Sequence, residues 1–363
     1  MSWTAKGRLA QSATPFLALD GPKMLRNIKR MAEQTAATGG QLTPHLKSHK
    51  SSEIARYQLA AGAGRATVAT VAEARMALAA GFDRLLLAYP PAPDWRADQF
   101  GELTAHADVV VTCSRSEHVE ALVRSEGTFG VYWEVDTGTG RLGTQPGRPT
   151  AEAVHAARFN ERVTLRGLLS FAGHAYAAVD EAGLADVARQ QHAALEASTA
   201  ALAELDIEAG LRTVGTTPLA AYERGQFEEY RYGNYVFNDA SQVALGSALL
   251  DDCALAVVAS VIDVSSSCAV VLDCGSKSLP AEVMTGRTTG FGTVLGHPDL
   301  QIVKLFEEHG LARSETPHGL VVGDRIAIVP NHACTCANLH DEYLVIDEEG
   351  DLVDRWDVLA RRG

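Results

Sequence analysis

The sequence lacks the features that would place it in a specialised class of protein. It has no apolar run of about 18–20 residues, the length that crosses a bilayer, and its start, MSWTAKGRLAQS, lacks the apolar core of a secretory signal. The net charge of −13 argues against nucleic acid and anionic membranes as general partners. The 6 cysteines are scattered rather than spaced as a disulfide framework. We therefore expect a cytoplasmic protein with reduced thiols.

What the sequence does contain is a regular alternation of short apolar runs and helical segments from residue 15 to about residue 218. The expected strands are 16–20, 42–47, 65–70, 84–89, 108–113, 130–138, 164–171 and 210–217. The expected helices are 22–38, 50–61, 71–80, 93–105, 115–125, 149–159 and 180–206. Eight strands that alternate with helices predict a (β/α)8 TIM barrel, an α/β fold. A doubly wound open sheet alternates in the same way, and spacing alone does not separate the two.

After residue 240 the sequence becomes rich in β-forming residues with turn-like separations. One helix is expected there, in QIVKLFEEHG at residues 301–310. We predict a barrel domain over residues 15–240, followed by a mainly antiparallel β domain over residues 241–363 that also includes residues 1–14.

The strand end PHLKSHK, residues 44–50, holds the residues best suited to amine chemistry. In a β/α barrel the functional groups follow the carboxyl ends of the strands. If this strand extends to residue 49, alternation places His45, Lys47 and His49 on one face and Lys50 on the other. A lysine desolvated at a barrel mouth has a lowered pKa and can form an imine with an aldehyde. The alternative is a solvated basic loop before the next helix.

Two further segments suggest a phosphate group. VGTTP, residues 214–218, offers small residues and hydroxyls at the end of the eighth expected strand, where barrels commonly bind phosphate. The polar, glycine-bearing segment EYRYGNYVFND, residues 229–239, follows it. With Lys47, these segments indicate a phosphorylated aldehyde, which is pyridoxal phosphate, although VGTTP alone is also an ordinary turn.

Two other strand ends carry candidate polar groups. VDTGTGRLGT presents Arg141 among three glycines, and an arginine held this way is a fixed cation with several donors. GHAYA places His174 and Tyr176 two residues apart, on one face if the chain is extended, and either can transfer a proton. The alternatives are a surface arginine on a flexible loop and a hydrogen-bonded histidine and tyrosine.

The C-terminal segment PNHACTCANLHDEY contains a candidate metal pair. His332 and Cys334 face the same way in an extended chain, and imidazole with thiolate suits Zn²⁺. Two protein ligands would leave coordination positions open for substrate or water. Cys336 continues the same face, and cysteine is also common in β cores, so the ligand set stays open.

A series of motifs spans nearly the whole chain in order: TPFLALD, PHLKSHK, VDTGTGRLGT, GHAY, VGTTP, RYGNYVFND, VLDCGSK, EEHG (307–310), VGDRIAIVPNHAC and ANLHD. Together they resemble the D-serine dehydratase and D-threonine aldolase family of pyridoxal-phosphate enzymes, which have the alanine-racemase-like fold. The resemblance implies a barrel followed by a β domain. It also implies a homodimer whose active sites lie where the barrel of one subunit meets the β domain of the other.

The resemblance also implies roles for individual residues. It makes Lys47 the Schiff-base lysine, with Tyr176 near the substrate. The other residues expected at the cofactor are His45, Arg141, His174, Gly215, Thr216, Thr217, Gly233 and Asn234, the last five at its phosphate. His332 and Cys334 match the metal pair of the family. The chain departs from the family at Thr43, where an arginine often stands, so any role of that arginine must be dispensable or supplied elsewhere.

The implied activity is a metal-dependent lyase reaction on D-configured 3-hydroxy amino acids. Dehydratases of the family tend to have His-x-Cys at the metal and aldolases His-x-Asp, so Cys334 favours a dehydratase that forms a 2-oxo acid and ammonia. The alternative is a D-threonine aldolase that forms glycine and an aldehyde. An amino-acid racemase would leave the His-x-Cys pair unexplained, and a non-catalytic pyridoxal-phosphate carrier would leave the C-terminal β region unexplained.

Overall fold

The computed structural model describes residues 9–284 and 287–361, which form two compact units. The first unit joins residues 9–28 with residues 48–51 and 234–361, and the second joins residues 29–47 with residues 52–233. Within the described ranges, every helix is too short or too polar to cross a membrane.

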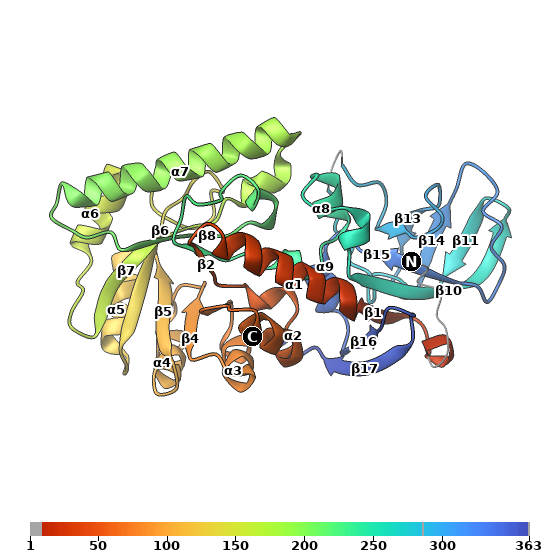
Figure 1. Ribbon diagram of the computed structural model, residues 1–363, viewed down its shortest axis with the longest axis horizontal. Helices are drawn as coiled ribbons and strands as arrows, with labels where there is room; N and C mark the ends of the chain where they lie inside the picture. Colours follow the sequence, from red (N-terminus) through yellow and green to blue (C-terminus); the bar gives the residue numbers. More distant parts are fainter. Residues whose placement is uncertain (1–8, 285–286, 362–363) are drawn as a thin grey trace. The chain divides into compact units, whose positions relative to one another are not determined.

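The second unit is built on a parallel sheet in which eight strands of the described chain follow the order β2-β9-β8-β7-β6-β5-β4-β3. These strands are β2 (Gln41–Leu42), β3 (Ala66–Val68), β4 (Arg84–Leu87), β5 (Asp108–Cys113), β6 (Phe129–Glu134), β7 (Val163–Ser170), β8 (Leu211–Val214) and β9 (Glu229–Tyr230). The connecting helices are α2 (Ser52–Ala60), α3 (Val71–Ala80), α4 (Asp94–Leu103), α5 (Ser116–Arg124), α6 (Arg148–Ala156) and α7 (Glu181–Ala203). Figure 1 shows strands and helices alternating along the chain.

Backbone contacts join the two ends of this strand order. His45, just after β2, forms a parallel bridge with Thr67 in β3. The N–H of Thr67 donates to the carbonyl of Pro44 at 2.9 Å, and the N–H of Gly64 donates to the carbonyl of Leu42 at 3.1 Å. The sheet therefore curls round on itself as a TIM-type barrel, which confirms the predicted fold class over the open doubly wound sheet.

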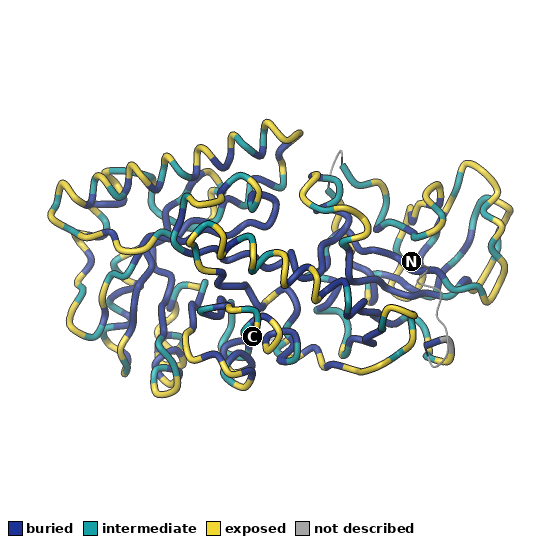
Figure 2. The backbone as a smooth tube through the Cα atoms, in the orientation of Figure 1, coloured by how far each residue is buried: buried dark blue, intermediate teal, exposed yellow. Residues whose placement is uncertain are grey.

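The barrel strands are buried on both faces, as the faces of a parallel sheet covered by helices must be. All of β6 is buried, and Figure 2 shows the strands largely in dark blue and much of the surface of α7 in yellow. Inside, Leu86, Val110, Tyr132 and Leu169 form a hydrophobic cluster from four different strands.

The first unit is a mainly antiparallel sheet, as predicted. Its strand order is β13-β14-β11-β10-β1-β16-β17, with β15 paired to both β10 and β12. The strands are β1 (Phe16–Asp20), β10 (Leu255–Ser266), β11 (Ala269–Leu272), β12 (Thr293–Val294), β13 (Gln301–Leu305), β14 (Gly310–Arg313), β15 (Arg325–Val329), β16 (Glu342–Ile346) and β17 (Leu352–Asp357). Helix α1 (Gly21–Ala36) follows β1, and the short helices α8 (Ala240–Ala244) and α9 (Ala333–Ala337) also begin in this unit.

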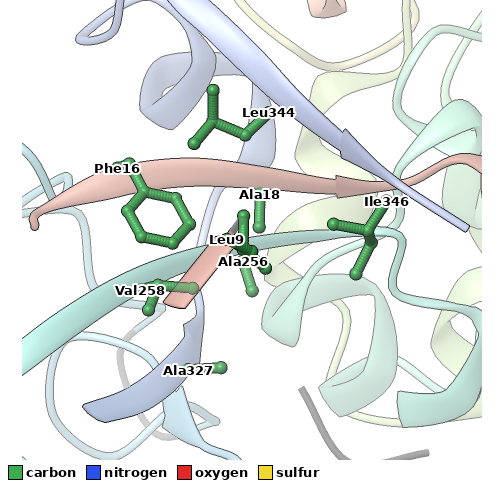
Figure 3. Close-up of a cluster of buried hydrophobic side chains, with 8 residues drawn as sticks. All are labelled: Leu9, Phe16, Ala18, Ala256, Val258, Ala327, Leu344 and Ile346. Carbon is green, nitrogen blue, oxygen red and sulfur yellow. The ribbon is translucent and has the colours of Figure 1, made fainter. Parts of the chain in front are cut away.

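A hydrophobic cluster forms the core of the first unit. Figure 3 shows its members, which come from the N-terminal turn at residues 9–11 and from four strands of the sheet: Leu9, Phe16, Ala18, Ala256, Val258, Ala327, Leu344 and Ile346. The two residues from β1 lie in the middle of this cluster, so β1 is a central strand of the unit.

Two expected elements are wrong. Residues 16–20 are not the first barrel strand, because β1 pairs antiparallel with β10 and parallel with β16; the eighth strand of the barrel is the short β9 instead. Residues 301–305 form β13 rather than a helix, paired with β14. Residues 16–20 are a fully buried run, and residues 301–305 are a short pleated strand. Neither has a hydrophobic period that identifies its partner strand, so long-range strand pairing decides the structure of each.

Candidate active site

The segment PHLKSHK does not continue as a strand. Strand β2 ends at Leu42, the backbone N–H of His45 donates to the carbonyl of Tyr232 at 3.0 Å, and residues Leu46–Ser48 then form the 3-10 turn η2. Successive side chains in such a turn diverge by about 120°, so the expectation that His45, Lys47 and His49 share one face of a strand is wrong.

Lys47 is presented by this turn. Its side chain is exposed, whereas Leu46 and Ser48 on either side are buried. The expected desolvation of this lysine is therefore wrong, because a turn at the strand end, rather than a strand inside the barrel, carries it. Lys50 is held differently: its Nζ donates to Oδ1 of Asn338 at 2.8 Å. Lys47 stays the predicted reactive amine.

Phe171 forms a platform for two cations of the predicted site. The guanidinium of Arg141 lies 4.8 Å from the ring centroid, and Nζ of Lys47 lies 5.9 Å from it, both within cation–π range. Both cations lie close enough to His45 to lower the pKa of its imidazole. Burial, reinforced by the charges of Lys47, Arg231 and Arg141, holds the pKa of His45 well below its usual value, so its imidazole is neutral at pH 7.

The loop that carries Arg141 is organised by one carboxylate. Oδ1 of Asp136 accepts hydrogen bonds from the N–H groups of Gly138 at 3.0 Å and Gly140 at 3.1 Å. Gly138 has φ +121°, and a Cβ there would lie 3.1 Å from the ring of His174. A larger residue would therefore displace the histidine, which explains the glycine at this position.

His174 and Tyr176 lie in the 3-10 turn η3 (Gly173–Ala177). The expectation that both point to one face fails, because that argument needs an extended chain. Nδ1 of His174 lies 3.5 Å from Oγ1 of Thr139, and its buried Nε2 has no hydrogen-bond partner within residues 9–284 and 287–361. A buried ring nitrogen in this state is suited to meet a ligand atom.

The predicted phosphate segments are held close together in the barrel unit. A Cβ on Gly215 would lie 2.8 Å from the carbonyl oxygen of Arg231, so only glycine allows these two backbones to approach. Thr216 and Thr217 are buried directly after it, at the start of the turn η4 (Thr217–Leu219), and Gly233 follows two residues after Arg231. The geometry is suited to a phosphate held by backbone N–H groups and hydroxyls.

Two charged residues of the barrel interior were not predicted. The buried guanidinium of Arg231 donates from Nη2 to the carbonyl of Ser170 at 2.6 Å and from Nε to Oγ1 of Thr213 at 3.0 Å. Burial lowers its pKa to about 10. Burial raises the pKa of Glu134, and Arg231 is the cation that most opposes this rise. Of these two residues, Arg231 also lowers the pKa of His45.

In the antiparallel unit, His332 and Cys334 lie at the start of α9, with His332 at the N-cap position. His332 itself is extended, and the chain becomes helical from Ala333 on. Glu282 hydrogen-bonds to Nδ1 of the imidazole, and the Cys334 side chain lies close enough to influence the ring. Burial disfavours protonation of His332, but these two partners outweigh it and raise its pKa to about 11. A metal ion bound to the pair would replace this proton.

Cys336 is separated from the pair. Its thiol is fully buried, directed at the carbonyl of Ser278 at 3.9 Å, and burial raises its pKa. Among residues 9–284 and 287–361, no group of three or more histidine, cysteine, aspartate or glutamate side chains could hold a metal ion. The pair His332 and Cys334 therefore stays a prediction for the metal site.

Asn234 was predicted as a site residue of this unit, and its partner Asp239 was not. Nδ2 of Asn234 donates to Oδ2 of Asp239 at 2.6 Å, and the N–H of Ala333 donates to the same oxygen at 2.9 Å. The sequence does contain a signal for Asp239, because an aspartate followed three residues later by Gln242 is a helix-start pattern. Arg231 and Glu282 have no such local signature.

Known proteins match this chain along nearly its whole length. Residues 19–241 match the family described as alanine racemase, N-terminal domain, and residues 254–346 match the putative serine dehydratase domain. D-threo-3-hydroxyaspartate dehydratase of Delftia sp. (strain HT23) is 30% identical over 95% of this chain and 97% of its own. D-threonine aldolase of Arthrobacter sp. is 29% identical over 97% of this chain and 94% of its own.

A solved structure agrees with these sequence relatives. The crystal structure of D-threonine aldolase from Filomicrobium marinum superposes with a TM-score of 0.88 at 27% identity, covering 97% of each chain. The similarity extends over both units of the described chain.

Proposed function

The chain belongs to the alanine racemase N-terminal domain family, here followed by a putative serine dehydratase domain, and from this premise we propose that it is a pyridoxal-phosphate-dependent lyase of D-configured 3-hydroxy amino acids. The observation that carries the proposal is the placement of Lys47 and Arg141 over Phe171 beside the barrel. A reactive amine and a fixed cation that share one aromatic platform suit an aromatic aldehyde cofactor.

The barrel residues fit pyridoxal phosphate by their own chemistry. Lys47 is exposed and so accessible to an aldehyde, and Nδ1 of His45 and Nε2 of His174 are buried polar atoms that have no partner in the described chain. Gly215 brings the backbone of the VGTTP segment against that of Arg231, where a phosphate can be held. Buried polar atoms without partners are costly unless a ligand satisfies them.

The pair His332 and Cys334 fits a divalent metal. Imidazole and thiolate are ligands that zinc favours, and the Cys334 side chain lies close enough to influence the imidazole of His332. We assign zinc to this pair. Glu282, on Nδ1 of His332, fixes the ring so that the other nitrogen is presented to the metal.

When bound, pyridoxal phosphate withdraws electron density from the substrate Cα, and zinc polarises the 3-hydroxyl as a Lewis acid. Lys47 holds the cofactor, and we assign its amine as the base that takes the proton from Cα. Arg141 and His174 position the cofactor. Tyr176 contacts the substrate, where its hydroxyl can donate or accept a proton.

Dehydration is the reaction that we favour. It removes the α-proton and the 3-hydroxyl as water, and hydrolysis of the enamine product gives a 2-oxo acid and ammonia. The thiolate of Cys334 supports this choice by the association of His-x-Cys with the dehydratases of the family. Cleavage to glycine and an aldehyde is the second candidate, supported by the 29% identity to D-threonine aldolase.

We further propose a homodimer with the active site at the subunit interface, on the family resemblance. Light scattering during gel filtration tests it, and a monomer that keeps full activity at every concentration would contradict it.

The test of function is product identification from D-threonine, with and without EDTA. We expect 2-oxobutyrate and ammonia, lost with EDTA and restored by zinc. Glycine and acetaldehyde would establish the aldolase instead, and L-threonine or L-allo-threonine would show racemisation. No turnover of D-serine, D-threonine or D-3-hydroxyaspartate by protein that holds the cofactor and zinc would refute the lyase.

A further inference from the structure

Asp239 connects the segment assigned to the cofactor phosphate with the loop assigned to the metal, and we propose that it is a positioning residue for both. The inference rests on the proposed function. Asp239 is completely buried. Its Oδ2 accepts hydrogen bonds from Nδ2 of Asn234 at 2.6 Å and from the N–H of Ala333 at 2.9 Å, and its Oδ1 accepts one from the N–H of Gln242 at 2.9 Å.

The bond to Ala333 acts on the metal pair because this residue lies between His332 and Cys334. The N–H of Ala333 lies in the first turn of α9 and therefore has no acceptor within the helix. The bond to Asp239 satisfies this N–H and fixes where the helix begins. Asp239 therefore determines the direction of both ligand side chains although it contributes no ligand itself.

The bond to Asn234 acts on the phosphate segment. It orients the side-chain amide so that Nδ2 faces Asp239, while Oδ1 is buried and has no partner in the described chain. An amide oxygen repels a phosphate, so we assign the contact of Asn234 with phosphate to its backbone N–H. That N–H lies at the start of the turn η5 (Asn234–Val236), which Asp239 fixes through the side chain.

A simpler role would be the capping of helix α8. Capping uses only Oδ1, through the bond to Gln242. Oδ2 makes two further bonds to segments that are five and ninety-four residues away in sequence. A residue that only capped helix α8 would not need the two bonds of Oδ2. These bonds therefore distinguish a positioning role from a capping role.

The test is the Asp239→Asn variant of the full chain loaded with pyridoxal phosphate and zinc. The substitution replaces one carboxylate oxygen by an NH2 group. This group cannot accept a hydrogen bond, so the N–H groups that faced the replaced oxygen lose their acceptor. We expect zinc affinity, measured by competition with a chromogenic chelator, to fall about 10–100-fold, as for other residues that orient metal ligands. Cofactor affinity, measured separately by dialysis of the zinc-loaded protein, should also fall.

Asp20→Asn is the matched control. Asp20 is buried in the same unit and accepts a hydrogen bond from the N–H of Lys23 at 2.9 Å at the start of a helix. Its substitution is expected to leave both affinities unchanged, because it contacts neither the phosphate segment nor the metal loop.

A second variant, Asn234→Ala, removes the bond to Asp239 without touching a metal ligand. A residue that serves only the cofactor would lower cofactor affinity alone, whereas the proposal predicts weaker zinc binding as well. This variant decides the question if Asp239→Asn does not fold. Wild-type zinc affinity in either variant overturns the proposal, and so does a wild-type chain that binds no zinc. A wild-type chain that binds zinc but no pyridoxal phosphate refutes the proposed function, and the zinc measurements still test the metal half of the inference.

Discussion

Replacement of Arg231 by methionine should destabilise the barrel through the loss of a buried cation. The substitution keeps much of the apolar stem but leaves the carbonyl of Ser170 and the hydroxyl of Thr213 without their donor, and removes the cation that most favours ionised Glu134. Loss of a buried cation that leaves a nearby buried carboxylate uncompensated costs about 3–5 kcal/mol. For a unit of this size we expect the midpoint of thermal unfolding to fall by on the order of 10 °C.

The assay is thermal unfolding at pH 7 followed by circular dichroism, with Arg224→Met as control. Arg224 is exposed in the same unit, so its replacement should change stability by less than about 0.5 kcal/mol. Adding Glu134→Gln to Arg231→Met should restore part of the loss, because the uncompensated buried carboxylate is then removed. Arg231→Met with wild-type stability, or no recovery in the double variant, would refute the assignment of this pair.

Glu223 is a buried carboxyl group of the barrel unit, and burial raises its pKa to about 8. Its contribution to the free energy of unfolding is fully present below pH 4.5 and is lost as pH rises to about 8. In urea unfolding, Glu223→Gln should therefore match the stability of the wild type at pH 5 and exceed it by a few kcal/mol at pH 9. An equal difference at both pH values would contradict this. Gly215→Ala should weaken binding of pyridoxal phosphate in equilibrium dialysis, because its Cβ would lie 2.8 Å from the backbone of Arg231; unchanged affinity would be inconsistent with a phosphate site there. Alanine at either His332 or Cys334 should abolish turnover of D-threonine and zinc retention while the cofactor absorbance persists, and activity that survives would remove zinc from the reaction.

The alternation of strands and helices was predictable from the sequence, and so was the mainly antiparallel C-terminal sheet. The sheet to which residues 16–20 belong could not be predicted, because a buried run such as FLALD suits a central strand of either sheet. Closure of the barrel could not be predicted from the sequence either. It depends on the bridge between His45 and Thr67, which lie at opposite ends of the strand order.

The candidate site shows the same division. Motifs predicted Lys47 and the pair His332 and Cys334 as site residues. The reasoning from strand alternation was wrong, because a 3-10 turn carries the lysine and a helix start carries the pair. Arg231 and Asp239 were missed because their partners are distant in sequence. No local pattern reports a contact such as that between Asp239 and Ala333.

The most direct test of the account is to locate the cofactor on the chain. The protein is incubated with pyridoxal phosphate, reduced with borohydride and digested, and the modified peptide is identified by mass spectrometry. The account predicts modification of Lys47, its loss in Lys47→Ala and its persistence in Lys50→Ala. Modification of Lys50, or retention of the reducible adduct in Lys47→Ala, would contradict it.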